Sequence, residues 1–205
     1  MLTFSQFLKE AATAKSKHYV LAFGRMNPIT SGHEALINKV HEVAKANNAD
    51  HGVVLSQSQD SKKNPLTATE KVKHATRAFP GTNIKAASSD QPTILHQAVA
   101  LHKQGVEHLH VIAGSDRAEE MQDLLHRYNG KDLKHGSYKF KSITVHSAGE
   151  RDPDAEGATG MSASKMRAHA AAGDKKAFHS GAPSKMSTPH KDEMFHDVRK
   201  GLGIA

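Results

Sequence analysis

Two stretches, far apart in the chain, hold residue types that bind phosphate groups in proteins. The first, FGRMNPITSGH at residues 23–33, has Arg25 as a fixed positive charge and His33 at the expected start of a helix. The second, MSASKMR at residues 161–167, has Ser162 in a position to cap another helix. The amides and the positive dipole end of a helix N-terminus suit phosphate oxygens. The two stretches together predict a polyphosphate site.

Each stretch alone also has a plainer interpretation. The first is compatible with an ordinary strand, turn and helix that carries a surface histidine. The second is compatible with a capped helix whose basic residues face water. The strand before the first stretch and the helix after it favour the phosphate site.

Strands and helices alternate around these stretches. Short apolar runs predict strands at residues 18–23, 51–56, 82–87, 108–114 and 138–146. Helical spacing of apolar residues predicts a helix that begins near His33 and helices at Thr67–Phe79, Thr93–Lys103, Ala118–Tyr128 and Ser162–Ala172. This order predicts an α/β fold with a doubly wound parallel sheet of about five strands and helices on both faces. Ligands of such sheets bind beyond the carboxyl ends of the strands. The loops in that position are 24–32, 57–66, 88–92, 114–117 and 147–161.

The two ends of the chain lie outside this alternation. Residues 3–14 have the apolar spacing of an amphipathic helix, within a leader that spans 1–17. The domain that carries the two stretches is predicted to span 18–178. Residues 179–205 are predicted to hold a flexible segment, up to residue 190, and then a short helix.

The composition argues against several classes of protein. The absence of cysteine excludes disulfides and thiolate zinc sites and fits a reducing compartment such as the cytoplasm. No apolar run approaches the roughly 20 residues of a membrane-spanning helix. The net charge of +7 suits phosphorylated substrates or nucleic acid, but the aromatic content of 5% disfavours nucleic acid. The 16 histidines are scattered, so most are interpreted as surface residues and no metal-binding residues are predicted.

The two stretches together resemble the nucleotidylyltransferase superfamily. Residues 24–33 are similar to its (H/T)xGH signature, with Thr30 where many members have histidine. Residues 161–167 are similar to its ISSTxxR motif, with one hydroxyl missing at Ala163. The resemblance covers about residues 18–172.

Further stretches resemble one branch of that superfamily. SQSQDSKKNPLTATEK, at residues 56–71, is similar to the NPFTxxER segment of archaeal-type nicotinamide mononucleotide adenylyltransferases. Gly24-Arg25 is similar to the start of their GRFxP element, and AGSD at 113–116 resembles the G-x-D of the superfamily.

The resemblance implies a Rossmann-like fold and a Mg²⁺-assisted reaction in which a substrate phosphate attacks the α-phosphate of ATP and pyrophosphate leaves. It implies that His33, with Thr30, acts at the α-phosphate, and that Lys165 and Arg167 act with Arg25 on the β- and γ-phosphates. The implied nucleotide-binding residues are Phe23, Gly24, Arg25, Met26, Gly32, Gly114, Asp116, Ser162 and Ser164. The implied substrate loop contains Lys62, Lys63 and Asn64, for which an exposed turn is the alternative.

The resemblance leaves the acceptor open. The NPLTATEK stretch favours nicotinamide mononucleotide, which would give NAD, whereas Thr30 favours phosphopantetheine. A cytidylyltransferase that uses CTP is a further alternative. An alternative of another class is a virion structural or nucleic-acid-binding protein that retains the fold. A homo-oligomer is compatible with any of these.

The start of the chain carries a separate resemblance. TFSQFLKEAA is similar to the capsid-targeting leaders of internal head proteins in large tailed bacteriophages, which are cut after a glutamate. Cleavage after Glu10 fits that pattern, and it would place a phage protein in the host cytoplasm or the virion. An ordinary amphipathic helix is the alternative.

Overall fold

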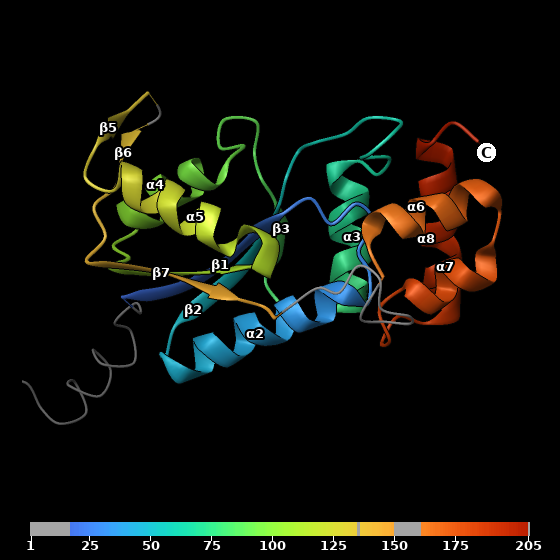
Figure 1. Ribbon diagram of the computed structural model, residues 1–205, viewed down its shortest axis with the longest axis horizontal. Helices are drawn as coiled ribbons and strands as arrows, with labels where there is room; N and C mark the ends of the chain where they lie inside the picture. Colours follow the sequence, from blue (N-terminus) through green and yellow to red (C-terminus); the bar gives the residue numbers. More distant parts are fainter. Residues whose placement is uncertain (1–16, 135, 150–160, 205) are drawn as a thin grey trace, which may run out of the picture.

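The computed structural model describes residues 17–134, 136–149 and 161–204. Its centre is a five-stranded parallel sheet with helices on both faces (Figure 1). The strands, in spatial order, are β3 (Ile84–Ala86), β2 (Asp50–Leu55), β1 (His18–Gly24), β4 (His108–Ala113) and β7 (Ser142–Ser147). The helices are α2 (Gly32–Ala46), α3 (Ala68–Ala78), α4 (Ile94–Lys103), α5 (Ser115–Tyr128), α6 (Ala163–Ala172), α7 (Lys175–Gly181) and α8 (Thr188–Gly201). The predicted doubly wound, Rossmann-like α/β architecture is confirmed.

Two apolar layers, one on each face of the sheet, hold the helices against it. On one face, Val20 and Ala22 of β1 belong to the same buried cluster as Val40 of α2. On the other face, Leu21 belongs to a cluster with Leu125 of α5. Successive residues of a strand point to opposite faces. Because both faces of β1 are covered, this strand reads in the sequence as an unbroken apolar run.

The strand predicted at residues 138–146 begins later than expected. Tyr138 and Phe140 precede β7 and pack into the α5 side of the core, where the Tyr138 hydroxyl donates to the Leu125 carbonyl at 2.8 Å. A short hairpin of β5 (Asp132–Leu133) and β6 (Gly136–Ser137) comes before them. The alternation of apolar residues at 138–140 therefore belongs to a loop that packs against the core, and not to a strand.

The structure also differs from the flexible segment predicted at 179–190. α7 extends to Gly181 and α8 begins at Thr188. Phe178 of α7 and Phe195 of α8 meet edge to face at 5.2 Å, in the cluster that also contains the α2 side of the sheet. Both helices thus share the main core. The small and polar residues between them form caps and a turn, which resemble a linker in composition.

The predicted leader helix at 3–14 and the cleavage position after Glu10 lie outside the described residues, as does most of the loop 147–161. Across the three described ranges, no helix combines the length and the apolar character that a bilayer crossing requires.

The structure gathers four of the histidines on adjacent strands. Nδ1 of His18 lies 3.2 Å from Nε2 of His110, and Nδ1 of His110 lies 3.1 Å from Nε2 of His146. The rings of His18 and His108 stack with their centroids 4.3 Å apart. His110 is an exception among histidines that were mostly interpreted as surface residues, because it is 8% exposed. Burial, and then the neighbouring imidazoles, lower the pKa of His110 to about 4.

We expect this cluster to weaken the fold in mild acid. A histidine in the unfolded chain has a pKa near 6.5. As the pH falls below that value, the unfolded chain binds a proton at His110, whereas the folded protein does not bind it until about pH 4. The free energy of unfolding should therefore fall across this window, by up to about 3 kcal/mol from His110. Urea unfolding between pH 7.5 and 4 measures it. His110→Gln should flatten the pH dependence; an equal slope in both proteins would contradict the assignment.

Candidate functional site

A cavity of about 560 Å³ lies at the carboxyl ends of β1 and β4. The strand order reverses between these two strands, which is where doubly wound sheets bind their ligands. The lining contains most of the residues predicted from the sequence: Phe23, Gly24, Arg25, Met26, Gly32, His33, Lys63, Asn64, Gly114, Asp116, Ser162, Ser164 and Arg167. Thr30, Lys62 and Lys165 are outside the lining.

The loop from β1 to α2 is held by its own buried residues. Asn27 is 1% exposed and Ile29 is 1% exposed, so this loop packs as core although it carries no regular structure. Ser31 is the N-cap residue of α2, but its side chain makes no capping bond. Instead the carbonyl of Thr30 accepts the amide of His33 at 3.0 Å and begins the helix. The first turn of α2 therefore faces the cavity from a rigid support.

Thr30 holds the imidazole of His33. The Thr30 amide donates to Nδ1 of His33 at 3.0 Å, and the Thr30 hydroxyl lies 2.9 Å from the same nitrogen. A backbone amide can only donate, so it holds Nδ1 as an acceptor. The proton of the neutral ring is then on Nε2.

The second motif forms the start of α6, as predicted. Ser162 is the N-cap, and its hydroxyl accepts the amide of Lys165 at 3.1 Å. Arg167 donates to the hydroxyl of Ser164 at 3.0 Å and to the carbonyl of Asn27 at 2.8 Å. The second of these bonds joins the two motifs directly. Lys165 is exposed on the outer side of this turn.

The cavity wall carries three guanidinium groups, those of Arg25, Arg117 and Arg167. Burial, and then the charge of Arg25, lower the pKa of Arg167 from its usual value. Arg167 remains charged at neutral pH, because a guanidinium loses its proton only in strongly alkaline solution. Arg25 and Arg167, beside the N-termini of α2 and α6, give this end of the cavity a charge that suits an anion.

The loop after β2 brings Lys63 and Asn64 to the same cavity. The carboxylate of Asp60 accepts the amide of Lys62 at 2.9 Å and that of Lys63 at 2.6 Å, and it also accepts the side-chain amide of Asn64. These bonds, that of Lys63 first, hold the pKa of Asp60 well below its usual range. The loop is therefore an ordered turn that places Lys63 at the cavity. Lys62 is not among the lining residues.

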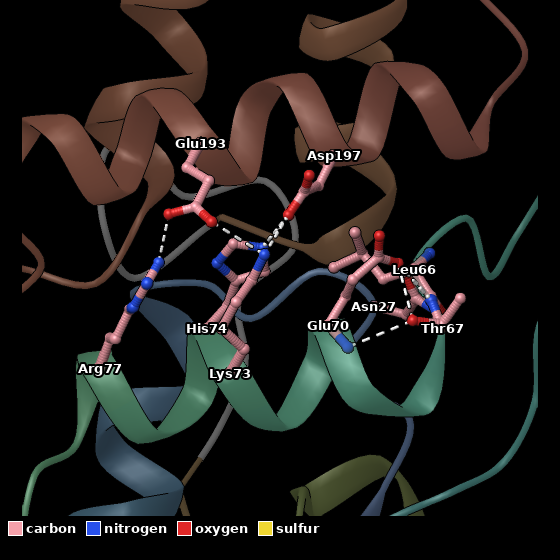
Figure 2. Close-up of polar contacts among 9 residues, drawn as sticks. All are labelled: Asn27, Leu66, Thr67, Glu70, Lys73, His74, Arg77, Glu193 and Asp197. Atoms are coloured by element: carbon pink, nitrogen blue, oxygen red, sulfur yellow. Dashed lines mark hydrogen bonds and ion pairs between the residues drawn. The ribbon is translucent and has the colours of Figure 1, made fainter.

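Asn27 ties the loops after β1 and β2 together. Its side-chain amide donates to the carbonyl of Leu66 at 2.9 Å, and its oxygen accepts the amide of Leu66 at 3.0 Å (Figure 2). A capping box of Thr67 and Glu70 follows directly and starts α3. The two NP dipeptides of the sequence, at 27–28 and 64–65, thus belong to one joint between loops.

Further along α3, ion pairs attach α8. Lys73 contacts Glu193 at 3.0 Å and Asp197 at 2.7 Å, and Arg77 also pairs with Glu193 (Figure 2). His74, which is fully buried, lies 2.9 Å from Asp197. Burial lowers the pKa of His74, so a neutral ring donates to Asp197. The C-terminal helices are therefore anchored to the element that begins at the Asn27 joint.

Several lining or neighbouring residues were not predicted from the sequence. Asn27 and Arg117 line the cavity. Lys71 is 1% exposed, and its ammonium donates to the carbonyls of Ser56 and Ser58. Burial, and then the charge of Arg25, lower the pKa of Lys71 to about 8. Asn27 and Lys71 lie within stretches already singled out from the sequence, and Arg117 directly follows one. Their residue types alone did not show that they would lie at or beside the cavity.

The carboxylates of the lining are Asp116 and Glu34. Within the described part of the chain, no three His, Cys, Asp or Glu side chains gather as metal ligands. Mg²⁺ commonly binds through substrate phosphates with one or two carboxylates and several waters. The residues present fit an ion that enters with a nucleotide, with Asp116 as the candidate protein ligand.

Comparison with models of known protein families finds no match, and a search of curated proteins finds none either.

Proposed function

We propose that this protein is a nucleotidyltransferase that transfers AMP from ATP to a phosphorylated acceptor, with nicotinamide mononucleotide as the leading acceptor. One observation carries the proposal: the N-termini of α2 and α6 meet at one cavity, beside Arg25 and Arg167. Two helix N-termini and two guanidiniums suit a polyphosphate better than a single phosphate. The rest of the cavity lies where the strand order reverses, which is where doubly wound sheets bind nucleosides.

In this proposal an oxygen of the acceptor phosphate attacks the α-phosphorus of ATP. The bond from that phosphorus to the bridging oxygen of the β-phosphate breaks, and pyrophosphate leaves. His33 donates from Nε2 to the α-phosphate as charge builds there, since Nδ1 is engaged by Thr30. Arg25 and Arg167 hold the β- and γ-phosphates with the hydroxyls of α6. Alignment and electrostatics are the main demands of such transfers.

Other residues take supporting roles. A Mg²⁺ ion bound to the triphosphate would supply charge neutralisation, and Asp116, which lines the cavity, would hold it. Lys63, which lines the cavity with Asn64, is the cationic residue that the loop after β2 brings there, where it suits the acceptor phosphate. Lys165 is exposed and outside the cavity lining, so the proposal places the two arginines ahead of it.

A pyrophosphate-release screen tests the proposal. ATP and CTP are each combined with nicotinamide mononucleotide, phosphopantetheine and other phosphorylated acceptors, in the presence of Mg²⁺. We expect release with ATP and nicotinamide mononucleotide and formation of NAD. Release only with phosphopantetheine or only with CTP would move the assignment within the superfamily. No release with any pair, together with DNA binding that falls steeply as salt rises, would contradict it and favour a nucleic-acid-binding protein.

A further inference from the structure

Thr30 does not lie where a phosphate ligand must lie. It is 0% exposed and does not line the cavity, although His33, three positions later, does. A side chain that contacts a substrate phosphate has to reach the surface of the cavity. The Thr30 hydroxyl instead lies 2.9 Å from Nδ1 of His33 and donates to the carbonyl of Met161 at 3.2 Å. Its neighbours are thus the imidazole and the residue just before the cap of α6.

The Thr30 contact is one of several bonds between the first motif and the C-terminal helices. The amide of Ser31 donates to the carbonyl of Gly181, at the end of α7, at 2.9 Å. Arg167 of α6 donates to the carbonyl of Asn27. Gly181 packs so closely on Met161 that a Cβ there would lie 2.5 Å from the Met161 side chain. The carbonyl that receives the Thr30 hydroxyl is therefore itself fixed by α7.

We propose that Thr30 is a positioning residue, which orients the imidazole of His33 and registers it against α6, and that it does not bind phosphate. The inference rests on the proposed nucleotidyl transfer. The amide of Thr30 sets which ring nitrogen carries the proton. Its hydroxyl has one proton and lies between Nδ1, at 2.9 Å, and the Met161 carbonyl, at 3.2 Å, so it bonds one of these acceptors at a time and packs against the other. The position of the His33 imidazole is thereby fixed relative to the phosphate-binding residues of α6. This gives α7 a role, because its Gly181 packs against Met161.

Three variants of Thr30 test the proposal. Thr30→Val removes the hydroxyl and keeps the shape, Thr30→Ala removes it without a new methyl group against the Met161 carbonyl, and Thr30→Ser retains it. We expect Val and Ala to lower kcat by about 10- to 10²-fold, as a small misplacement of a catalytic group does. The dissociation constant for ATP should change by less than about threefold, because the phosphate ligands remain. Thr30→Ser should recover most of kcat. Thermal unfolding shows which of the variants are folded.

An NMR measurement reports on the link without turnover. We expect the ring signals of His33 in the substrate-free protein to indicate a proton on Nε2. They should move in Thr30→Val or Thr30→Ala, stay near their wild-type positions in Thr30→Ser, and leave the signals of His41 on the same helix unchanged. This measurement and ATP binding decide the proposal even if no acceptor supports turnover, which separates its failure from that of the proposed function.

Two results would overturn the role of Thr30. One is unchanged His33 signals in the folded Val or Ala variant. The other is a loss of ATP affinity as large as the loss of kcat, which would show that the hydroxyl binds phosphate.

Discussion

His33→Ala is expected to lower kcat about 10²- to 10³-fold, the loss typical of a preorganised donor that acts on charge in the transition state. The ring is 8% exposed and held at Nδ1 by Thr30, so it needs no rearrangement when the reaction begins. Binding of ATP should change less, because Arg25 and Arg167 remain in the cavity. Initial rates of pyrophosphate release over a range of ATP concentrations separate kcat from KM.

A matched control for this variant lies on the same helix. His41→Ala also removes an imidazole from α2, but His41 is exposed and contacts Thr82, outside the cavity. We expect it to keep a wild-type kcat. Near-normal kcat in His33→Ala would refute the assignment of the α-phosphate donor, and an equal loss in both variants would point to damage of the helix.

Asn27→Ala is expected to lower the free energy of unfolding by about 2–4 kcal/mol, since it leaves two buried backbone groups without their partner. The side chain is 1% exposed and forms both a donor and an acceptor bond with Leu66. Leu66 is itself 0% exposed, so water does not replace these bonds. Urea unfolding at neutral pH measures the loss.

Asn47→Ala is the control for the stability effect. Asn47 is the C-cap residue of α2, and its side chain donates to the carbonyl of Val43 at 2.8 Å. That carbonyl also accepts the backbone amide of Asn47, and the site is half-buried. The loss should stay below about 1 kcal/mol. Similar losses in Asn27→Ala and Asn47→Ala would contradict the proposed joint between the two loops.

The sequence was most informative where local and tertiary requirements agree. The apolar run of β1 and the helical spacing after Thr67 are local patterns, and both elements appear as predicted. The order of strands and helices also predicted the sheet and the loops at its carboxyl edge, because few topologies join such elements. At 138–140, by contrast, Tyr138 and Phe140 alternate like a strand but pack as a connection. Packing overrides a short period-two pattern when neighbouring helices offer an apolar surface.

The chemistry of the two motifs divides in the same way. Residue types and spacing by themselves determined the fold class, and most of the residues that they singled out line one cavity. Only the tertiary structure decided which of them face a ligand. Thr30 and His33 are both polar, but the turn of the chain buries one behind the other. Burial, and the choice among hydrogen-bond partners such as the Met161 carbonyl, depend on residues more than 100 positions away, which local patterns do not encode.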